Sequence, residues 1–271
     1  MKEKFNIKEF RTLAGNNWLG SEVLYLDSVD STNTYLKNLD HEKISHGMMA
    51  VTDDQTNGRG QFRKKWLSEP GKNLTFTLLF TPARADGLML LTVATASAIS
   101  KVLEDLTKFS SEVKWPNDIF LNGKKIGGVL TECLFMGKTP ERVLLGIGLN
   151  INQVKFNSEL ETSATSLMKE TGERFNREHV LSRILTAIQH AYGRWHKMDS
   201  KLPADVNKNI EGYGQWVTIT LNGVQQKGSF KFLGINEKGE CLFLNEELDV
   251  NTFSHEQIRI ITGSNKISET A

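Results

Sequence analysis

A glycine-rich, basic segment at residues 58–66 carries residue types that can bind phosphate. Its sequence is Gly-Arg-Gly-Gln-Phe-Arg-Lys-Lys-Trp. Glycines let backbone N–H groups approach a ligand closely, and the cations that follow can neutralise phosphate charge. Trp66 could stack on a base or pack the loop. A solvated basic loop has the same composition, so this segment alone leaves both interpretations open.

A second segment, residues 114–118, gathers a cation, an amide and a carboxylate in the sequence Lys-Trp-Pro-Asn-Asp. Lys114 could pair with phosphates, and Asn117 and Asp118 carry the oxygen ligands that Mg²⁺ prefers. Pro, Asn and Asp are also standard turn formers, so a structural turn after a buried Trp is an equal alternative.

Glycines inside two apolar runs indicate a ligand groove. Lys125 precedes a Gly-Gly pair that ends at Gly128, and residues 146–152 read Gly-Ile-Gly-Leu-Asn-Ile-Asn. A glycine inside a strand weakens it and indicates that a ligand or another backbone approaches closely. Gly146 and Gly148 lie on one face of such a strand with Asn150 beyond them, and two such strands side by side would leave a groove wide enough for a flat ligand. Lysines beside an Asn-Gly turn are also common at a soluble hairpin tip.

Small polar side chains precede a predicted short helix that runs towards Leu39. Ser31, Thr32 and Asn33 could cap that helix, which is the usual role of such a cluster. The same groups offer donors and acceptors that could bind a polar head such as a ureido ring. Gln55 has the same two interpretations.

The elements that would position these residues are two amphipathic helices and a hairpin. Apolar residues recur at three- and four-residue intervals over residues 84–108, which predicts a long helix. The Asn-Gly pair at residues 122–123 predicts a tight hairpin, because both turn residues need positive φ. A second helix is predicted from Arg177 to about Met198, with Asn176 as its cap.

The character of the chain changes near residue 211. Beyond it, short apolar runs are separated by Asn-Gly at residues 222–223 and Lys-Gly at residues 238–239. This pattern is typical of a small all-β barrel. We therefore predict an α+β main domain at residues 1–211 and a small β domain at residues 212–271.

Composition limits the class of protein. The formal net charge is +1, from 33 Lys and Arg against 32 Asp and Glu, which argues against a general nucleic-acid binder. Cys133 and Cys241 lie far apart with no metal-binding or disulfide spacing, which fits a reducing compartment. The N-terminus has no export signal, and the most apolar stretch, residues 88–99, is too short to span a bilayer. We expect a cytoplasmic protein that binds neither nucleic acid nor membranes.

Taken together, these motifs resemble the biotin–protein ligases. The resemblance covers roughly residues 23–262 and implies a catalytic α+β domain, in which helices pack on a mixed β-sheet as in class II aminoacyl-tRNA synthetases. It also implies a small C-terminal SH3-like β-barrel. The motifs that carry the resemblance are Ser31-Thr32-Asn33, the segment from Gln55 to Gly60, Trp66, residues 70–74, residues 114–118, Lys125 with its Gly-Gly pair, and residues 146–150.

The resemblance implies a reaction as well. The biotin carboxylate attacks the α-phosphate of ATP, giving biotinyl-5′-AMP and pyrophosphate, and an acceptor lysine then attacks the mixed anhydride. ATP, Mg²⁺ and biotin are the implied small molecules. A biotin carboxyl carrier protein, such as that of acetyl-CoA carboxylase, is the implied partner. Since no covalent enzyme intermediate is required, catalysis rests on positioning and charge neutralisation.

Carried over position by position, the resemblance assigns roles to the candidate residues. Lys125, Arg59 and Lys114 would be the catalytic cations, and Asn117 would be a candidate Mg²⁺ ligand. The biotin site would comprise Ser31, Thr32, Asn33, Gln55, Arg59, Gly60, Gln61, Lys125, Gly128 and Gly146. The nucleotide site would comprise Trp66, Arg63, Lys114, Asn117 and Asn150.

Gln61 departs from the family pattern, because many bacterial relatives have an arginine at this position. A neutral amide cannot make the charge-assisted contact of a guanidinium. We therefore expect either that Arg63 or Lys64 supplies the charge, or that the adenylate is held less tightly.

Other functions stay open. A lipoate-type protein ligase would share the fold and the adenylate chemistry, although the motifs at residues 58–60 and 114–118 disfavour it. A non-enzymatic biotin-binding sensor would not need Lys114 and Lys125. Residues 1–20 are too short for a winged-helix module, so a repressor role is not expected. A homodimer formed through a sheet edge is compatible with the sequence.

Overall fold

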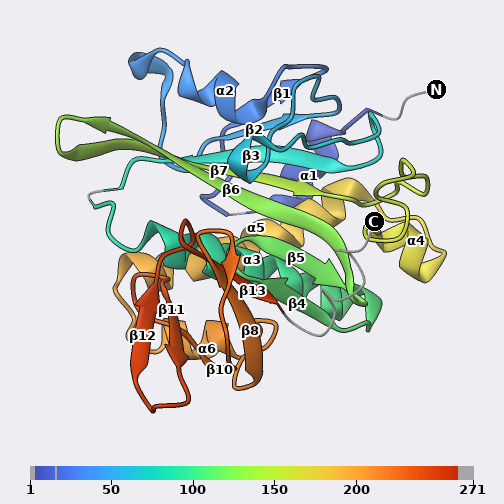
Figure 1. The fold of residues 1–271 in the computed structure, drawn as a ribbon. Coiled ribbons are helices and arrows are strands. Elements are labelled where there is room, and N and C mark those ends of the chain that lie inside the picture. Colours follow the sequence, from blue (N-terminus) through green and yellow to red (C-terminus); the bar gives the residue numbers. More distant parts are fainter. Residues whose placement is uncertain (1–3, 16, 83, 262–271) are drawn as a thin grey trace.

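A seven-stranded mixed β-sheet forms the centre of the protein (Figure 1). The structure, a computed structural model, describes residues 4–15, 17–82 and 84–261. The strand order is β1-β2-β3-β7-β6-β5-β4, in which β1 and β2 are parallel and the other pairs are antiparallel. The strands are β1 (Val23–Leu26), β2 (Met49–Thr52), β3 (Leu74–Phe80), β4 (Ser111–Lys114), β5 (Asp118–Leu121), β6 (Lys124–Met136) and β7 (Thr139–Leu149).

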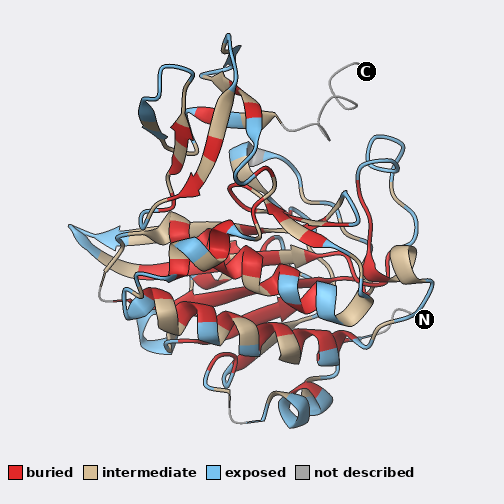
Figure 2. Ribbon diagram, turned by 90° about the horizontal axis from the view of Figure 1, so that it is seen from below, coloured by how far each residue is buried: buried red, intermediate tan, exposed pale blue. Residues whose placement is uncertain are grey.

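Long helices cover one face of this sheet. α3 packs against α5 and against β4, β5 and β6, and α1 packs on α5. Figure 2 shows the buried side of these helices turned towards the sheet and the exposed side turned outwards. Among the described residues, no helix combines the length and the apolar character needed to cross a membrane. The helices of the described ranges are α1 (Ile7–Ala14), α2 (Thr32–Lys37), α3 (Leu88–Thr107), α4 (Leu167–Thr171), α5 (Arg177–His196) and α6 (Leu202–Asn207), with 3₁₀ turns η1 (His41–Lys43) and η2 (Gln61–Arg63).

Alternation along the strands separates the two faces of the sheet. In β7, Val143 belongs to the large core formed with α3 and α5, whereas Leu144 belongs to a smaller cluster with Leu36 of α2. Successive side chains of a strand point to opposite faces, so Gly146 and Gly148 lie on the same face as Leu144. The sheet is therefore packed by long helices on one side and carries these glycines on the side of α2.

The predicted helices and hairpin are confirmed, with one boundary corrected. α5 begins at Arg177 and is capped by the side chain of Asn176. β5 and β6 meet at the Asn-Gly turn, whose residues have φ of 51° and 74°. α3 begins at Leu88 rather than Arg84. The reason is that Arg84 packs on the end of α5, where its guanidinium lies 4.8 Å from the ring centroid of Trp195 and donates to the carbonyl oxygen of that residue.

A second, curled antiparallel sheet follows, consistent with the predicted SH3-like barrel and completing an α+β architecture. Its strand order is β12-β11-β10-β8-β13, and β9 pairs with β8. The side-chain amide of Asn207 in α6 exchanges hydrogen bonds of 3.2 and 2.8 Å with the backbone of Ile235. Trp115 Nε1 donates to the Gly239 carbonyl oxygen at 3.2 Å. The strands are β8 (Trp216–Leu221), β9 (Val224–Gln225), β10 (Phe230–Ile235), β11 (Cys241–Leu244), β12 (Val250–Phe253) and β13 (Ile258–Ile261).

Candidate active site

A cavity of about 700 Å³ lies on the glycine-bearing face of the main sheet. It is lined by the start of α2, the loop at residues 58–66, β6, β7 and part of the second sheet. Every predicted site residue whose side chain the structure describes lines it, and the side chain of Arg63 lies outside the described part. The predicted residues that line the cavity are Ser31, Thr32, Asn33, Gln55, Arg59, Gly60, Gln61, Trp66, Lys114, Asn117, Lys125, Gly128, Gly146 and Asn150.

Glycines form the floor of the cavity. Gly128 of β6 lies opposite Gly148 of β7, and Gly146 follows on the same face of β7. A Cβ atom on Gly146 would overlap the amide of Asn33, and a Cβ atom on Gly148 would overlap the indole of Trp66. The glycines thus let two side chains lie directly on the strand backbone, which is the close approach that the sequence predicts.

One end of the cavity is a buried hydrogen-bond network. Thr32 donates its backbone N–H and its hydroxyl to Gln55 Oε1, at 3.0 and 3.2 Å. Thr77 Oγ1 lies 2.7 Å from Thr32 Oγ1 and 2.6 Å from Asn33 Oδ1. Asn33 Nδ2 donates to Glu132 Oε2 at 2.7 Å. The network holds hydroxyl and amide groups at fixed positions, where a ring that both donates and accepts hydrogen bonds could bind.

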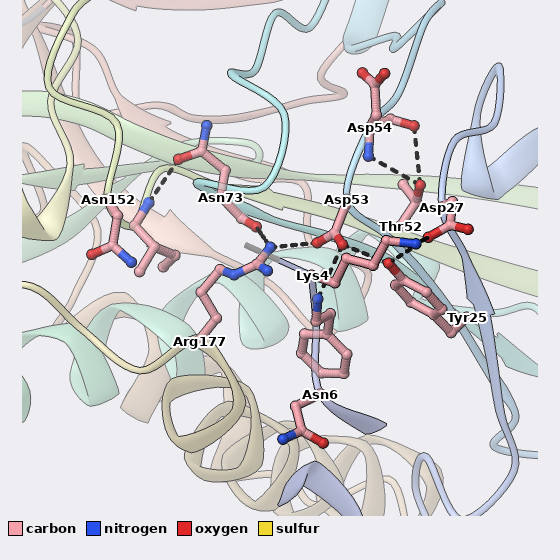
Figure 3. A network of polar contacts seen from close by, with 12 residues as sticks. Lys4, Asn6, Tyr25, Asp27, Thr52, Asp53, Asp54, Asn73, Asn152 and Arg177 are labelled. Atoms are coloured by element: carbon pink, nitrogen blue, oxygen red, sulfur yellow. Dashed lines mark hydrogen bonds and ion pairs between the residues drawn. The ribbon is translucent and has the colours of Figure 1, made fainter. Parts of the chain in front are cut away.

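A buried ion pair holds the segment that carries Gln55 (Figure 3). Arg177 Nη1 of α5 lies 2.7 Å from Asp53 Oδ1, and Asp53 Oδ2 accepts from the Tyr25 hydroxyl at 2.6 Å. Asp53 Oδ2 also accepts from the Phe5 N–H at 3.0 Å. Partial burial and the hydrogen bond to Asp53 raise the pKa of Tyr25, so its hydroxyl stays a neutral donor. Because Asp53 precedes Gln55 by two residues, this network fixes the start of the loop.

The loop at residues 58–66 folds over the cavity as a small hairpin. The Gly60 N–H donates to the Lys64 carbonyl oxygen at 2.8 Å, and the Trp66 N–H donates to the Gly58 carbonyl oxygen at 3.0 Å. This closure places the Trp66 indole on the cavity floor. The indole Nε1 is buried and has no hydrogen-bond partner among the described residues.

Two contacts connect this loop to other elements. Arg59 Nη2 donates to Thr34 Oγ1 at 2.8 Å, and Ser31, the N-cap of α2, accepts from the Thr34 N–H. The capping interpretation of Ser31 is thus confirmed, although Ser31 also lines the cavity.

At the loop tip, Phe62 has a φ of 55° and is 58 % exposed. The Arg259 guanidinium of β13 lies 4.6 Å from its ring centroid, a cation–π contact from the second sheet.

Lys125 lines the opposite, cationic end of the cavity, and Lys114 of β4 lines its side. Lys125 Nζ lies 2.6 Å from Asp118 Oδ1, and both side chains are partly exposed, at 39 % and 30 %. Lys114 Nζ lies 5.6 Å from the ring centroid of Phe120. An ion pair in contact with water contributes little net free energy, so a substrate carboxylate or phosphate can replace Asp118 at Lys125 without a large cost.

Two buried amides, those of Asn117 and Asn150, also line the cavity. Asn117 Nδ2 donates to the Val129 carbonyl oxygen at 2.9 Å, and Asn150 Nδ2 donates to the Thr165 carbonyl oxygen at 3.0 Å. Asn150 Oδ1 is buried without a hydrogen-bond partner in the described ranges, so a donor on a ligand would compensate it. No group of three His, Cys, Asp or Glu side chains in those ranges could hold a metal ion.

Sequence reasoning missed two segments that line the cavity. Phe156 and Leu160 come from the loop after β7, which has no periodic pattern. Thr220 and Arg259 come from β8 and β13 of the second sheet. Arg259 therefore adds a cation near Gln61, where the sequence points only to Arg63 or Lys64.

Known proteins are similar to this chain in sequence and in fold. The profile of the biotin/lipoate A/B protein ligase family matches residues 25–150. The chain is 30 % identical over 249 residues to the bifunctional ligase/repressor BirA of Bacillus spizizenii, an alignment that covers 90 % of this chain and 76 % of that protein. It is 25 % identical over 217 residues to the biotin–[acetyl-CoA-carboxylase] ligase of Mycobacterium tuberculosis, covering 78 % and 79 %.

A solved structure agrees with the sequence comparisons. The biotin protein ligase from Aquifex aeolicus, in complex with biotin and ATP, is similar with a TM-score of 0.76 at 30 % identity, covering 89 % of this chain and all of that one. The chain therefore belongs to the biotin/lipoate A/B protein ligase family. Within that family, the relatives from Mycobacterium tuberculosis and Aquifex aeolicus are ligases for biotin.

Proposed function

We propose that this chain activates biotin with ATP to biotinyl-5′-AMP and transfers the biotinyl group to a lysine of a carboxyl carrier protein. The observation that carries the proposal is the order of groups along β7, from a buried hydrogen-bonding end over a glycine floor to a cationic end. Asn33 lies against Gly146 and Trp66 against Gly148. Further along the strand, the Asn150 N–H donates to the carbonyl oxygen of Ile126, the neighbour of Lys125. Biotin has a ureido ring at one end and a carboxylate at the other, so its polarity matches that order.

The buried end would hold the ureido ring. Its carbonyl oxygen needs donors and its two N–H groups need acceptors, which hydroxyl and amide side chains supply together. The residues proposed for this role are Ser31, Thr32, Asn33 and Gln55. Gly128 would leave room for the bicyclic ring system over the sheet, and Gly146 would let the Asn33 amide lie close to the strand beside it.

In the first step, a carboxylate oxygen of biotin bonds to the α-phosphorus of ATP, and the bond to the leaving pyrophosphate breaks. Lys125 would hold the carboxylate, and Lys114 and Arg59 would neutralise charge on the phosphates. Asp118 would keep Lys125 in place before biotin arrives, given their 2.6 Å separation.

The nucleotide would extend past the lysines towards the loop after β7. Trp66 and Asn150 would contact it, and Arg63 remains a predicted contact that lies outside the described side chains. Mg²⁺ would arrive with the phosphates of ATP, since the described residues contain no cluster of metal ligands. The amide oxygen of Asn117 is the protein ligand that we propose for it.

In the second step, the acceptor amine bonds to the acyl carbon, AMP leaves with the bonding electron pair, and the amine loses a proton. The loop at residues 58–66, with Gly60 and Gln61 at its turn, would exclude water from the mixed anhydride until then. Lys64 lines the cavity and would supply the charge that Gln61 lacks.

The remaining assignments are also proposals. Residues 1–211 would form the catalytic domain and residues 212–271 the β domain, with a biotin carboxyl carrier domain as acceptor. The need for ATP and the free thiols of Cys133 and Cys241 support a cytoplasmic location. A homodimer through a sheet edge would appear as twice the chain mass in sedimentation.

Biotin-dependent exchange between ATP and labelled pyrophosphate tests the proposal. We expect exchange in the parent and a loss on the order of a hundredfold or more in Lys125→Ala, because the carboxylate loses its cation. Lys43→Ala, which removes an exposed lysine paired with Asp40, is the matched control and should keep parental exchange. Exchange with lipoate but not biotin would assign the lipoate-type alternative, and exchange with neither would leave a binding protein.

A further inference from the structure

α2 is held at both ends by a single strand, β7. At its first turn, the Asn33 amide lies against Gly146. At its last turn, Arg142 Nη1 donates to the carbonyl oxygens, at 3.2, 3.2 and 3.0 Å, of Leu36, Lys37 and Leu39.

The spacing of residues on β7 matches the length of α2. Arg142, Leu144 and Gly146 alternate along the strand and therefore share one face. Leu144 packs with Leu36 of α2 in the smaller core cluster. Four strand residues span about 13 Å and a helix of this length spans about 9 Å, so the cation and the glycine can reach opposite ends of α2.

Arg142 is the group that satisfies the C-terminal end of α2. The last carbonyl groups of a helix have no partner within the helix, and a cation beside them also interacts favourably with the helix dipole. Arg142 is only 6 % exposed, and its Nη2 is held by Glu141 at 2.7 Å. Without the guanidinium, these carbonyl groups, of which that of Leu36 is buried, would need water or a shift of the helix.

A shift of α2 would act on the predicted biotin pocket. α2 has six residues, and its first turn carries Thr32 and Asn33. Because these side chains bond to Gln55 and Glu132 at 3.2 Å or less, a small rotation of so short a helix would break the network. By contrast, Lys114 and Lys125 lie on β4 and β6 and would keep their positions.

We propose that Arg142 is a positioning residue for biotin: by fixing the C-terminal end of α2, it sets Thr32 and Asn33 against Gln55 and Gly146. The inference rests on the proposed function and concerns the buried end of the cavity alone. An arginine that only stabilised the fold would change the free energy of unfolding without weakening the binding of biotin more than that of ATP.

Calorimetric titration of biotin into the full chain tests this role. Arg142→Gln should raise the Kd for biotin about tenfold, while the KM for ATP in the exchange assay, measured at saturating biotin, stays at the parental value. Arg142→Lys keeps the positive charge but loses the planar set of N–H donors of the guanidinium. Its Kd for biotin should therefore lie between those of the parent and Arg142→Gln. Arg194→Gln is the control, because Arg194 lies in the last turn of α5, pairs with Asp199 and does not line the cavity.

The outcomes separate the inference from the proposed function. A parent that binds no biotin contradicts the proposed function itself. A parent that binds biotin, with a folded Arg142→Gln of equal affinity, overturns the role of Arg142, and so does an equal rise in the KM for ATP. If Arg142→Gln does not fold, Arg142→Lys decides, and a parental Kd in that variant overturns the inference.

Discussion

The two ends of the cavity differ in how their polar groups are satisfied. At the buried end, Thr32, Asn33 and Gln55 already bond to one another or to neighbouring side chains. At the cationic end, Lys125 makes an ion pair that is open to water. A buried network is costly to disturb, whereas an exposed ion pair exchanges partners at little cost. We infer that the buried end recognises a group that does not change, and that the cationic end adapts as charge moves between two chemical steps.

The largest effect is expected from Gly146→Ala. The added methyl group would overlap the Asn33 amide, so the Asn33 side chain, α2 or β7 must shift, and we expect biotin affinity to fall on the order of a hundredfold. Calorimetry measures the change. Gly193→Ala is the control, because a Cβ atom on Gly193 of α5 meets nothing within 4 Å. If Gly146→Ala bound biotin with parental affinity, the buried network could rearrange at little cost. The two ends of the cavity would then not differ in how costly they are to disturb.

A smaller effect is expected from Thr32→Val, which keeps the shape and removes the hydroxyl. Gln55 and Thr77 would each lose a partner in a buried site, so we expect biotin affinity to fall about tenfold with no change in the KM for ATP. Thr92→Val removes an equally buried hydroxyl of α3, paired with Thr131, and should not change either constant. A rise in the KM for ATP would mean that the two ends are coupled.

The smallest effect is expected at the exposed loop tip, from Phe62→Ala. The variant removes the ring under Arg259, and an exposed cation–π contact contributes about 0.5–1 kcal/mol. Release of biotinyl-5′-AMP from the loaded protein should therefore become about two- to fivefold faster. A filter assay that retains the protein and its bound adenylate measures the rate of release. Biotin affinity should stay parental. Unchanged release would mean that the second sheet does not hold the loop.

Local sequence patterns predicted the elements whose determinants are themselves local. Asn176 caps α5 because its side chain accepts from the His179 N–H in the first turn of that helix, and the Asn-Gly turn needs only its own two residues. The glycine groove was predictable because glycines at Gly128 and Gly146 are unfavourable in a strand unless something lies against them. Such patterns also place most candidate site residues, since each motif is contiguous.

What the sequence could not predict depends on contacts between distant segments. Arg259 reaches the loop tip only because the second sheet packs beside it. The start of α3 was misplaced because Arg84 binds Trp195 rather than continuing the helix. Arg142 resembles any strand arginine until α2 is placed over β7.

The position of Trp66 has a spectroscopic consequence. Indole emission responds to the polarity around the ring, and Trp66 lies on the cavity floor with its N–H unpaired by the described residues. Of the five tryptophans, Trp115 also lines the cavity, but its N–H is already bonded to Gly239. Binding at the nucleotide site should therefore change the intrinsic fluorescence mainly through Trp66. The time course of this label-free signal would follow the formation of the adenylate and the transfer of biotin to the acceptor.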